Sequence, residues 1–193
     1  MTDYEKDLVK RYELVLESQS VKLNTTEIFK TINRLKQKLN AADIPFYLTG
    51  GAAMAKYGLF RYTDDADIVV YGPRQDVIDY LSIRGFKEVQ DTNIMYDREN
   101  GISVDILPGG GKVVGPVRLN FPQPKAGEEL VSLSALISLK LDCYACNGIE
   151  RARDLGDVVE LIKINKLPRE FPIEQVVQDD YFDIWDKLHK KHE

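Results

Sequence analysis

Acidic residues stand at the start of a segment that otherwise has the composition of a buried strand. The stretch TDDADIVV places Asp64, Asp65 and Asp67 directly before the apolar residues 68–70. Because an isolated carboxylate is costly to bury, this arrangement indicates either a strand end at the surface or a site for a positive group. Side chains alternate between the faces of a strand, so Asp65 and Asp67 point the same way, about 6.6 Å apart. Asp64 faces the other way and is expected to cap the preceding loop.

A second apolar segment, ISVDIL, carries one carboxylate, Asp105. If this segment pairs beside the first, Asp105 joins Asp65 and Asp67, because neighbouring strands lie about 4.8 Å apart. Three carboxylates so close repel one another unless cations intervene, and two Mg²⁺ (or Mn²⁺) ions fit such a cluster. A calcium-binding EF-hand loop does not fit, because the positions that require Asp or Asn and then Gly are Val69 and Val70.

A glycine pair supplies a second site feature upstream of the aspartates. Gly50 and Gly51 follow the apolar residues 46–48 and precede a short helical segment. A strand followed by glycines and a helix N-terminus favours phosphate binding, because backbone N–H groups face the anion and no Cβ blocks its approach. Lys56 and Arg61 are positive groups within reach of a polyphosphate. Together with the carboxylates, these features predict a nucleotide site that holds a metal-bound NTP.

Hydrophobic spacing and turn signals predict the elements that position these residues. Helical periodicity, capping residues and glycine stops predict helices over residues 4–17, 24–39, 52–58, 74–85, 132–147, 151–164 and 182–190. Alternating or short apolar runs predict strands over residues 46–49, 65–71, 93–96 and 102–107, with an edge strand over 113–119. An Asn-Gly turn at 100–101 is typical of a hairpin.

The order of these elements predicts an α/β (α+β) protein with a small mixed sheet flanked by helices and a helical C-terminal third. A length of 193 residues suits a single domain, 1–193. Within it we expect N-terminal helices over residues 1–44, a core over 45–127 that carries the glycines and aspartates, and a C-terminal helical region over 128–193.

Composition excludes several other function classes. The net charge of −5 argues against bulk, non-specific nucleic-acid binding. His189 and His192 are the two histidines and lie in the lysine-rich tail, so a Ser-His-Asp or Cys-His hydrolase is not expected. Cys143 and Cys146 are interpreted as small hydrophobic residues of a helix face. The sequence shows neither a signal peptide nor a membrane span, which predicts a cytoplasmic protein.

The spacing of the site residues resembles the nucleotidyltransferase superfamily of DNA polymerase beta type. The pattern is a hydrophobic residue and Gly-Gly, then Asp-x-Asp with hydrophobic flanks, then a lone Asp in a later strand. It reads here as Gly50-Gly51, thirteen residues, Asp65-Ala66-Asp67, and later Asp105. The intervening pattern, G-x-A-x4-G-x2-R-x-T-x-D-x-D, is similar to small members that include the AbiEii-type toxins and the antibiotic-modifying enzymes. The resemblance covers roughly residues 46 to 164.

The resemblance implies roles for the individual residues. The three aspartates of the pattern would bind the divalent metals, and the two glycines would hold the β- and γ-phosphates. The family's helical tail implies site roles for Lys140 and for Asp154 or Asp157. The chain departs from many relatives in having Ala52 after the second glycine, where they have Ser or Thr, so only backbone N–H groups face the phosphates there.

From these features we expect a metal-dependent nucleotidyltransferase that transfers NMP from an NTP to an acceptor hydroxyl. The acceptor, which could be RNA, a protein or a small molecule, is left open by the sequence, as is the oligomeric state. Two alternatives remain: a catalytically inactive binding module of the same fold, favoured by the missing hydroxyl at Ala52, and a toxin–antitoxin-type interaction protein.

Overall fold

The structure is a computed structural model of the chain, and it describes residues 22–90, 92, 94–112 and 116–190. The helix that the sequence predicts over residues 4–17 lies outside the described residues. The α-helices are α2 (Lys22–Asn40), α3 (Gly50–Lys56), α4 (Arg74–Ser82), α5 (Leu133–Asn147), α6 (Ala152–Asn165) and α7 (Gln178–His189). Short 3-10 turns precede α6 (Gly148–Arg151) and α7 (Gln175–Val177).

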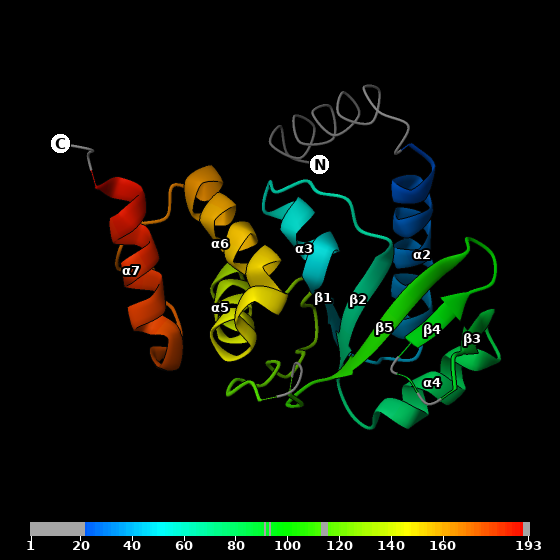
Figure 1. The fold of residues 1–193 in the computed structure, drawn as a ribbon. Helices are drawn as coiled ribbons and strands as arrows, with labels where there is room; N and C mark the ends of the chain where they lie inside the picture. The colour runs from blue at the N-terminus through cyan, green and yellow to red at the C-terminus, as the bar shows by residue number, and fades with distance from the viewer. Residues whose placement is uncertain (1–21, 91, 93, 113–115, 191–193) are drawn as a thin grey trace.

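A five-stranded mixed sheet forms the centre of the molecule (Figure 1). Its strands are β1 (Phe46–Leu48), β2 (Asp65–Val70), β3 (Phe86–Glu88), β4 (Ile94–Asp97) and β5 (Ile102–Pro108), in the spatial order β1-β2-β5-β4-β3. The central strands β2 and β5 are parallel, and the other neighbouring pairs are antiparallel. The parallel pair is the part of the sheet that matters for the site, since it carries all three predicted metal-binding aspartates.

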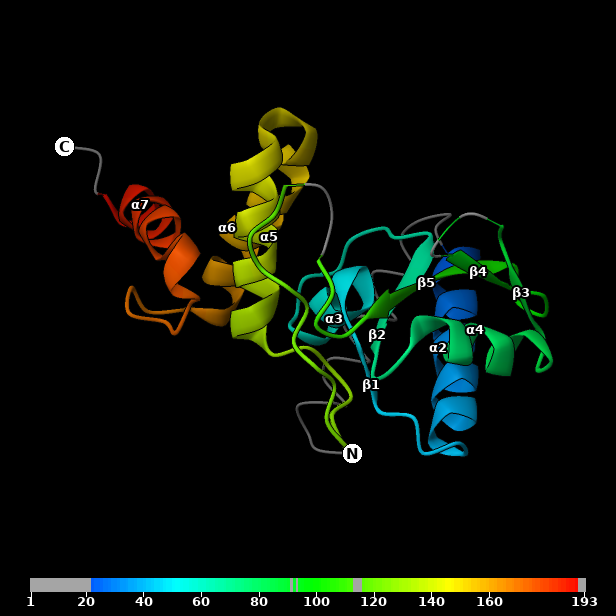
Figure 2. The same cartoon turned by 90° about the horizontal axis from the view of Figure 1, so that it is seen from below.

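The two faces of β2 and β5 have different neighbours. Ala66, Ile68 and Val70 of β2 belong to a buried cluster with residues of α2 and α4, which lie on the same side of the sheet in Figures 1 and 2. The opposite face carries Asp65 and Asp67 and looks toward the C-terminal helices. A second buried cluster joins α3, α5, α6 and α7 beside β1. Strand alternation therefore sends apolar residues into the core and leaves the carboxylates facing the space between the two clusters.

The predicted mixed α/β fold with a helical C-terminal region is confirmed, with local differences. Strand β3 was not predicted, because its three residues follow directly after the predicted helix 74–85 and are too few to show alternation; α4 in fact ends at Ser82. Helix α2 covers Lys22–Asn40, so it includes two residues ahead of the predicted start at residue 24. Of the predicted edge strand 113–119, the described residues 116–119 form no strand, although Lys112 and Asn120 pair in an isolated bridge. Among the described helices, none combines the length and hydrophobicity required to cross a membrane.

Candidate active site

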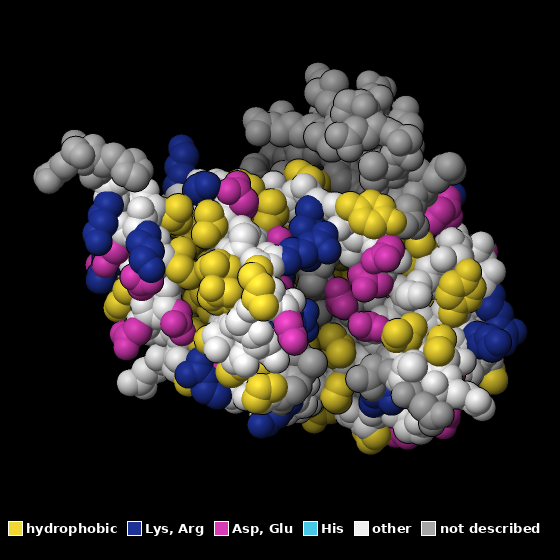
Figure 3. Space-filling model, in the orientation of Figure 1, with side chains coloured by type: hydrophobic (Ala, Val, Ile, Leu, Met, Phe, Trp, Pro, Cys, Tyr) yellow, Lys and Arg dark blue, Asp and Glu magenta, His cyan; other side chains and the backbone are white. Residues whose placement is uncertain are grey.

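A cleft of ≈ 440 Å³ lies between the sheet and the helices α5 and α6. Its two sides differ in charge: Figure 3 shows acidic side chains gathered on one side of the hollow and Lys and Arg side chains opposite them. The charged lining residues are Arg61, Asp64, Asp65, Asp67, Asp105, Lys140, Arg151, Arg153 and Asp154. We call the side formed by β2 and β5, with Asp65, Asp67 and Asp105, the acidic wall. The facing side, with Arg61 and the charged residues of α5 and α6, is the basic wall.

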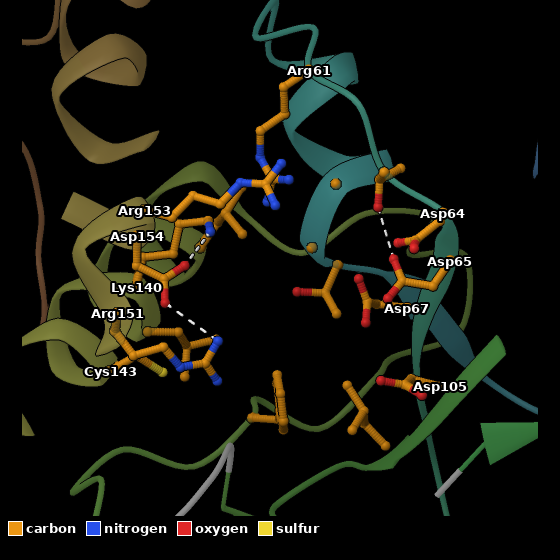
Figure 4. A pocket seen from close by; sticks show the side chains of 18 of the residues that line it. Arg61, Asp64, Asp65, Asp67, Asp105, Lys140, Cys143, Arg151, Arg153 and Asp154 are labelled. Atoms are coloured by element: carbon orange, nitrogen blue, oxygen red, sulfur yellow. Dashed lines mark hydrogen bonds and ion pairs between the residues drawn. The ribbon is translucent and has the colours of Figure 1, made fainter. Parts of the chain in front are cut away.

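The acidic wall brings together the three aspartates that the sequence singled out. Parallel pairing places Asp67 directly opposite Asp105. Asp65 lies two residues before Asp67 on the same face, and one carboxylate oxygen of each residue lies within 4.8 Å of those of the other two. Figure 4 shows all three side chains directed into the cleft. This proximity follows from the alternation of side chains along β2 and from the register with β5.

The Thr63 hydroxyl orients Asp65. The Thr63 hydroxyl donates a hydrogen bond to Asp65 Oδ1 at 2.7 Å, which fixes one carboxylate oxygen and leaves the other free for a ligand. Asp64 is exposed and also lines the cleft. Thr63 was not assigned a role by the sequence analysis, although the T-x-D-x-D spacing quoted there contains it; a Thr two residues before a carboxylate is the signal that could have found it.

Burial and mutual repulsion oppose the ionisation of this cluster. Burial, followed by the negative charges of Asp65 and Asp105, raises the pKa of Asp67 to about 7, against the opposing effect of Lys140 and Arg61. Burial and the charge of Asp65 also raise the pKa of Asp105. Asp67 and Asp105 are therefore costly to charge unless a cation lies nearby.

A divalent cation fits the donor set of the acidic wall. Mg²⁺ and Mn²⁺ prefer oxygen ligands, and Mg²⁺ commonly combines one or two carboxylates with waters and phosphate oxygens. Within the described part of the chain, no Lys or Arg forms an ion pair with any of the three aspartates, because the nearby cations pair with Asp154 and Asp157 instead. Among the described residues, the negative charge of the cluster thus has no directly paired counter-ion.

The glycine pair lies beside the acidic wall and could not carry side chains there. Gly50 opens α3 with φ +56°, and a Cβ added to it would lie 1.8 Å from Asp67 Oδ2. A Cβ on Gly51 would lie 2.8 Å from the Thr63 hydroxyl oxygen. The amide of the preceding residue, Thr49, donates to the Asp67 carbonyl at 3.0 Å, which fixes the turn against β2. Both glycines line the cleft, so their backbone reaches the position where the sequence predicts phosphates.

The basic wall is built around a buried lysine. Lys140 on α5 is 8% exposed, and its Nζ donates hydrogen bonds to Asp154 Oδ1 and Asp157 Oδ2, both at 2.7 Å. The two aspartates lie on α6, three positions apart, and therefore present their carboxylates on one face of that helix. The sequence analysis predicted roles for Lys140 and one of these aspartates; the structure brings all three together, with Lys140 and Asp154 lining the cleft.

Arginines complete the basic wall. Arg61, in the loop before β2, forms an ion pair with Asp157, with Nε 3.1 Å from Oδ1. Arg153 Nη2 donates a hydrogen bond to the Tyr62 carbonyl at 3.0 Å. Arg151 Nη1 lies 3.7 Å from Asp154 Oδ2. Arg151 lies just before α6 and Arg153 in its first turn, and neither was given a role from the sequence, so their position at the cleft was missed; an Arg-rich start of a helix facing the site is the signal that could have found it.

Lys56 and Cys143 do not lie where the sequence suggested with respect to the cleft. Lys56 is exposed at the last position of α3 and is not among the residues that line the cleft, so its role in phosphate binding stays a prediction without geometric support. Cys143 is buried on α5, as expected for a small hydrophobic residue, but it also lines the cleft. Burial raises the pKa of the Cys143 thiol to about 11, which keeps it protonated and unreactive near neutral pH.

The same arrangement of sheet and helices occurs in solved structures. No protein-family model matches the chain, and no curated protein matches it. The solution structure of the antibiotic-resistance factor ANT(2'')-Ia matches with a TM-score of 0.55 and 13% identity, over 86% of this chain and 96% of that one. The crystal structure of ANT(2'')-Ia in complex with adenylyl-2''-tobramycin matches with a TM-score of 0.50 and 12% identity, over 81% and 97% of the two chains.

A third solved structure also matches. An antigenic nucleotidyltransferase-like protein from Paracoccidioides brasiliensis has a TM-score of 0.52 and 19% identity, over 74% of this chain and 78% of that one. At identities this low, a structural match establishes the fold and leaves the activity to be argued from the site. The chain has the fold of the nucleotidyltransferase superfamily.

Proposed function

We propose that this protein transfers a nucleoside monophosphate from an NTP to an acceptor hydroxyl, with Mg²⁺ or Mn²⁺ held by Asp65, Asp67 and Asp105. The observation that carries the proposal is the acidic wall, in which three carboxylates lie within 4.8 Å of one another without a protein counter-ion among the described residues. Bound there, the metal would neutralise the carboxylates and polarise the phosphates of the NTP.

The other groups of the cleft fit the remaining requirements of such a transfer. The backbone at Gly50 and Gly51 would approach the β- and γ-phosphates, since no Cβ intervenes. Arg61 and Lys140 would balance the negative charge that develops on the leaving pyrophosphate. In the reaction, the acceptor oxygen forms a bond to the α-phosphorus while the bond between that phosphorus and the oxygen of the departing pyrophosphate breaks. Asp105, whose pKa is raised by burial, would take the acceptor proton.

The test is transfer of a labelled nucleotide. Wild-type protein is incubated with each α-labelled NTP and Mg²⁺ or Mn²⁺, together with pooled RNA, protein and small-molecule acceptors. We expect a labelled product and stoichiometric pyrophosphate with the wild type, and neither with Asp67→Ala. Wild-type protein that yields no labelled product with any NTP and acceptor pool would contradict the proposed transfer.

One observation favours a second candidate, a nucleotide-binding module without turnover. Ala52 follows the glycine pair and offers no hydroxyl to the phosphates, so fewer donors hold the triphosphate in place for attack. Saturable binding of Mg²⁺-NTP without pyrophosphate release under every acceptor condition would select this candidate over the transferase.

A further inference from the structure

The two oxygens of the Asp157 carboxylate contact two different cations from two different elements. Oδ2 accepts a hydrogen bond from Lys140 Nζ of α5 at 2.7 Å. Oδ1 lies 3.1 Å from Nε of Arg61, which belongs to the loop between α3 and β2. Asp157 itself lies on α6 and is only 6% exposed. One buried carboxylate therefore joins the C-terminal helices to the loop that leads into the acidic wall.

Asp154 is a close counterpart on the same helix but does not make this connection. Its Oδ1 accepts from Lys140 at the same distance, 2.7 Å, while its Oδ2 faces Arg151 at 3.7 Å. Both aspartates therefore hold Lys140, and only Asp157 also holds Arg61. This difference separates the two residues experimentally.

Further contacts continue from Arg61 to the acidic wall. Arg153 of α6 donates to the Tyr62 carbonyl at 3.0 Å, so α6 contacts two successive residues of the loop. The next residue, Thr63, donates to Asp65 Oδ1 at 2.7 Å and lies against Gly51. Three consecutive loop residues thus connect α6 with Asp65 and Gly51 on the other side of the cleft.

We propose that Asp157 is a positioning residue, which holds Arg61 and Lys140 as a fixed pair of cations facing the acidic wall so that an NTP triphosphate binds between them. The proposal rests on the transferase or nucleotide-binding function proposed above and identifies what arranges its basic wall. A long arginine side chain that is already oriented loses less conformational freedom when phosphate binds, so fixing it increases affinity. Buried counter-charges also keep the two cations from repelling one another before the NTP arrives.

The test compares Asp157→Asn with Asp154→Asn in equilibrium binding. Binding of each of the four NTPs in the presence of Mg²⁺ is measured by calorimetry on the full chain, and folding of each variant is checked by its thermal transition. We expect Asp157→Asn to raise Kd for Mg²⁺-NTP by about 10-fold to 100-fold, the range for one contact to a charged group. Asp154→Asn leaves Arg61 held and is expected to raise Kd by no more than about threefold.

A double-mutant cycle with Arg61→Gln distinguishes positioning from general damage to the fold. If Asp157 acts through Arg61, Asp157→Asn will raise Kd by at most about threefold in a protein that already carries Arg61→Gln. Should Asp157→Asn lose its cooperative thermal transition, Arg61→Lys is measured instead, because it keeps the positive charge but not the guanidinium that Asp157 orients. We expect it to raise Kd at least about 10-fold, and an unchanged Kd would overturn the positioning role.

The outcomes separate the inference from the proposed function. Wild-type binding with equal losses in Asp154→Asn and Asp157→Asn, or full additivity with Arg61→Gln, would overturn the positioning role and leave the nucleotide-binding function intact. Wild-type protein that binds none of the four NTPs would overturn both. A selective loss in Asp157→Asn that disappears in the Arg61→Gln background would establish the role.

Discussion

The two walls of the cleft differ in whether their buried charges are paired. On the basic wall, the buried charges are paired: Lys140 contacts two aspartates at 2.7 Å, and Arg61 shares one of them. On the acidic wall, three carboxylates lie together, and within the described residues none has an ionic partner. Both walls are rich in aspartate, and on the acidic wall burial raises the pKa values of Asp67 and Asp105.

The difference indicates which wall requires a bound ligand to balance its charge. A paired buried carboxylate is satisfied within the protein and contributes mainly to position. A cluster of unpaired carboxylates destabilises the fold at neutral pH and is retained where a cation compensates for it. We therefore propose that the acidic wall binds the metal ion and that buried ion pairs position the cations of the basic wall, and four predictions test that division.

The largest effect is expected from removing a carboxylate of the acidic wall. Asp67→Ala would lower the rate of nucleotide transfer by at least roughly 10³-fold, because the metal would lose a ligand at the reacting phosphate. Initial rates of pyrophosphate release measure the effect. Asp76→Asn, an exposed carboxylate in the first turn of α4, is the matched control and would retain the wild-type rate. Equal rates for Asp67→Ala and the control would remove the distinction between the walls.

A methyl group placed against the acidic wall is expected to have the next largest effect. Gly50→Ala would put a Cβ 1.8 Å from Asp67 Oδ2 at φ +56°, so both strain and a clash oppose it. We expect the free energy of unfolding to fall by roughly 2–4 kcal/mol, with loss of transfer activity.

Gly127→Ala separates the two causes of that loss. Gly127 also has positive φ, +83°, but a Cβ there meets nothing within 4 Å. Strain alone would cost this variant about 1–2 kcal/mol with activity preserved. Urea denaturation and transfer rates of both variants measure the difference; a Gly50→Ala protein as active as Gly127→Ala would show that Asp67 can move without consequence.

Stability without metal should depend on pH through the acidic wall. The pKa of Asp67 is raised to about 7 in the folded protein, from about 3.8 in the unfolded chain. Protonated Asp67 therefore stabilises the folded state fully below pH 3.8, and this stabilisation is lost as the pH rises to about 7. In EDTA at pH 8, Asp67→Asn is therefore expected to be more stable than wild type by roughly 1–3 kcal/mol. The gap would shrink toward pH 4. Urea titrations across this range measure it, and a gap independent of pH would place the cost elsewhere.

The smallest effect is expected on the helix of the basic wall. Gly156 lies exposed inside α6 between the two lysine-binding aspartates, and a Cβ there meets nothing within 4 Å. Gly156→Ala would raise the free energy of unfolding by about 0.5–1 kcal/mol, because alanine favours the helix and loses less backbone entropy on folding. Transfer activity would be unchanged if α6 only positions groups. Thermal denaturation checks the gain, and a loss of stability would contradict the helical account of this wall.

Local sequence rules predicted part of the acidic wall. The Asp-x-Asp alternation puts Asp65 and Asp67 on one face, whereas Asp105 was expected beside them only if its strand paired with theirs, as β5 does with β2. The Gly-Gly turn was recognised from its place between an apolar run and the start of a helix; the structure adds that a Cβ on Gly50 would clash with Asp67.

The basic wall was harder to predict because its contacts join residues far apart in the chain. Helical spacing shows that Asp154 and Asp157 share a face, but it does not reveal that Arg61 is the partner of Asp157. The same limit explains Lys56, which is near the site in sequence yet lies on the exposed end of α3. Long side chains and packing between helices, rather than local periodicity, decide such pairs.

Metal binding by the acidic wall is the central claim, and Mn²⁺ titration followed by electron paramagnetic resonance tests it most directly. We expect wild-type protein to bind Mn²⁺ in competition with Mg²⁺, more tightly when an NTP is present, and we expect Asp67→Asn and Asp105→Asn to lose this binding while Asp154→Asn keeps it. Wild-type protein that leaves Mn²⁺ free, or that loses it only when Asp154 is replaced, would contradict the assignment of the metal to the acidic wall.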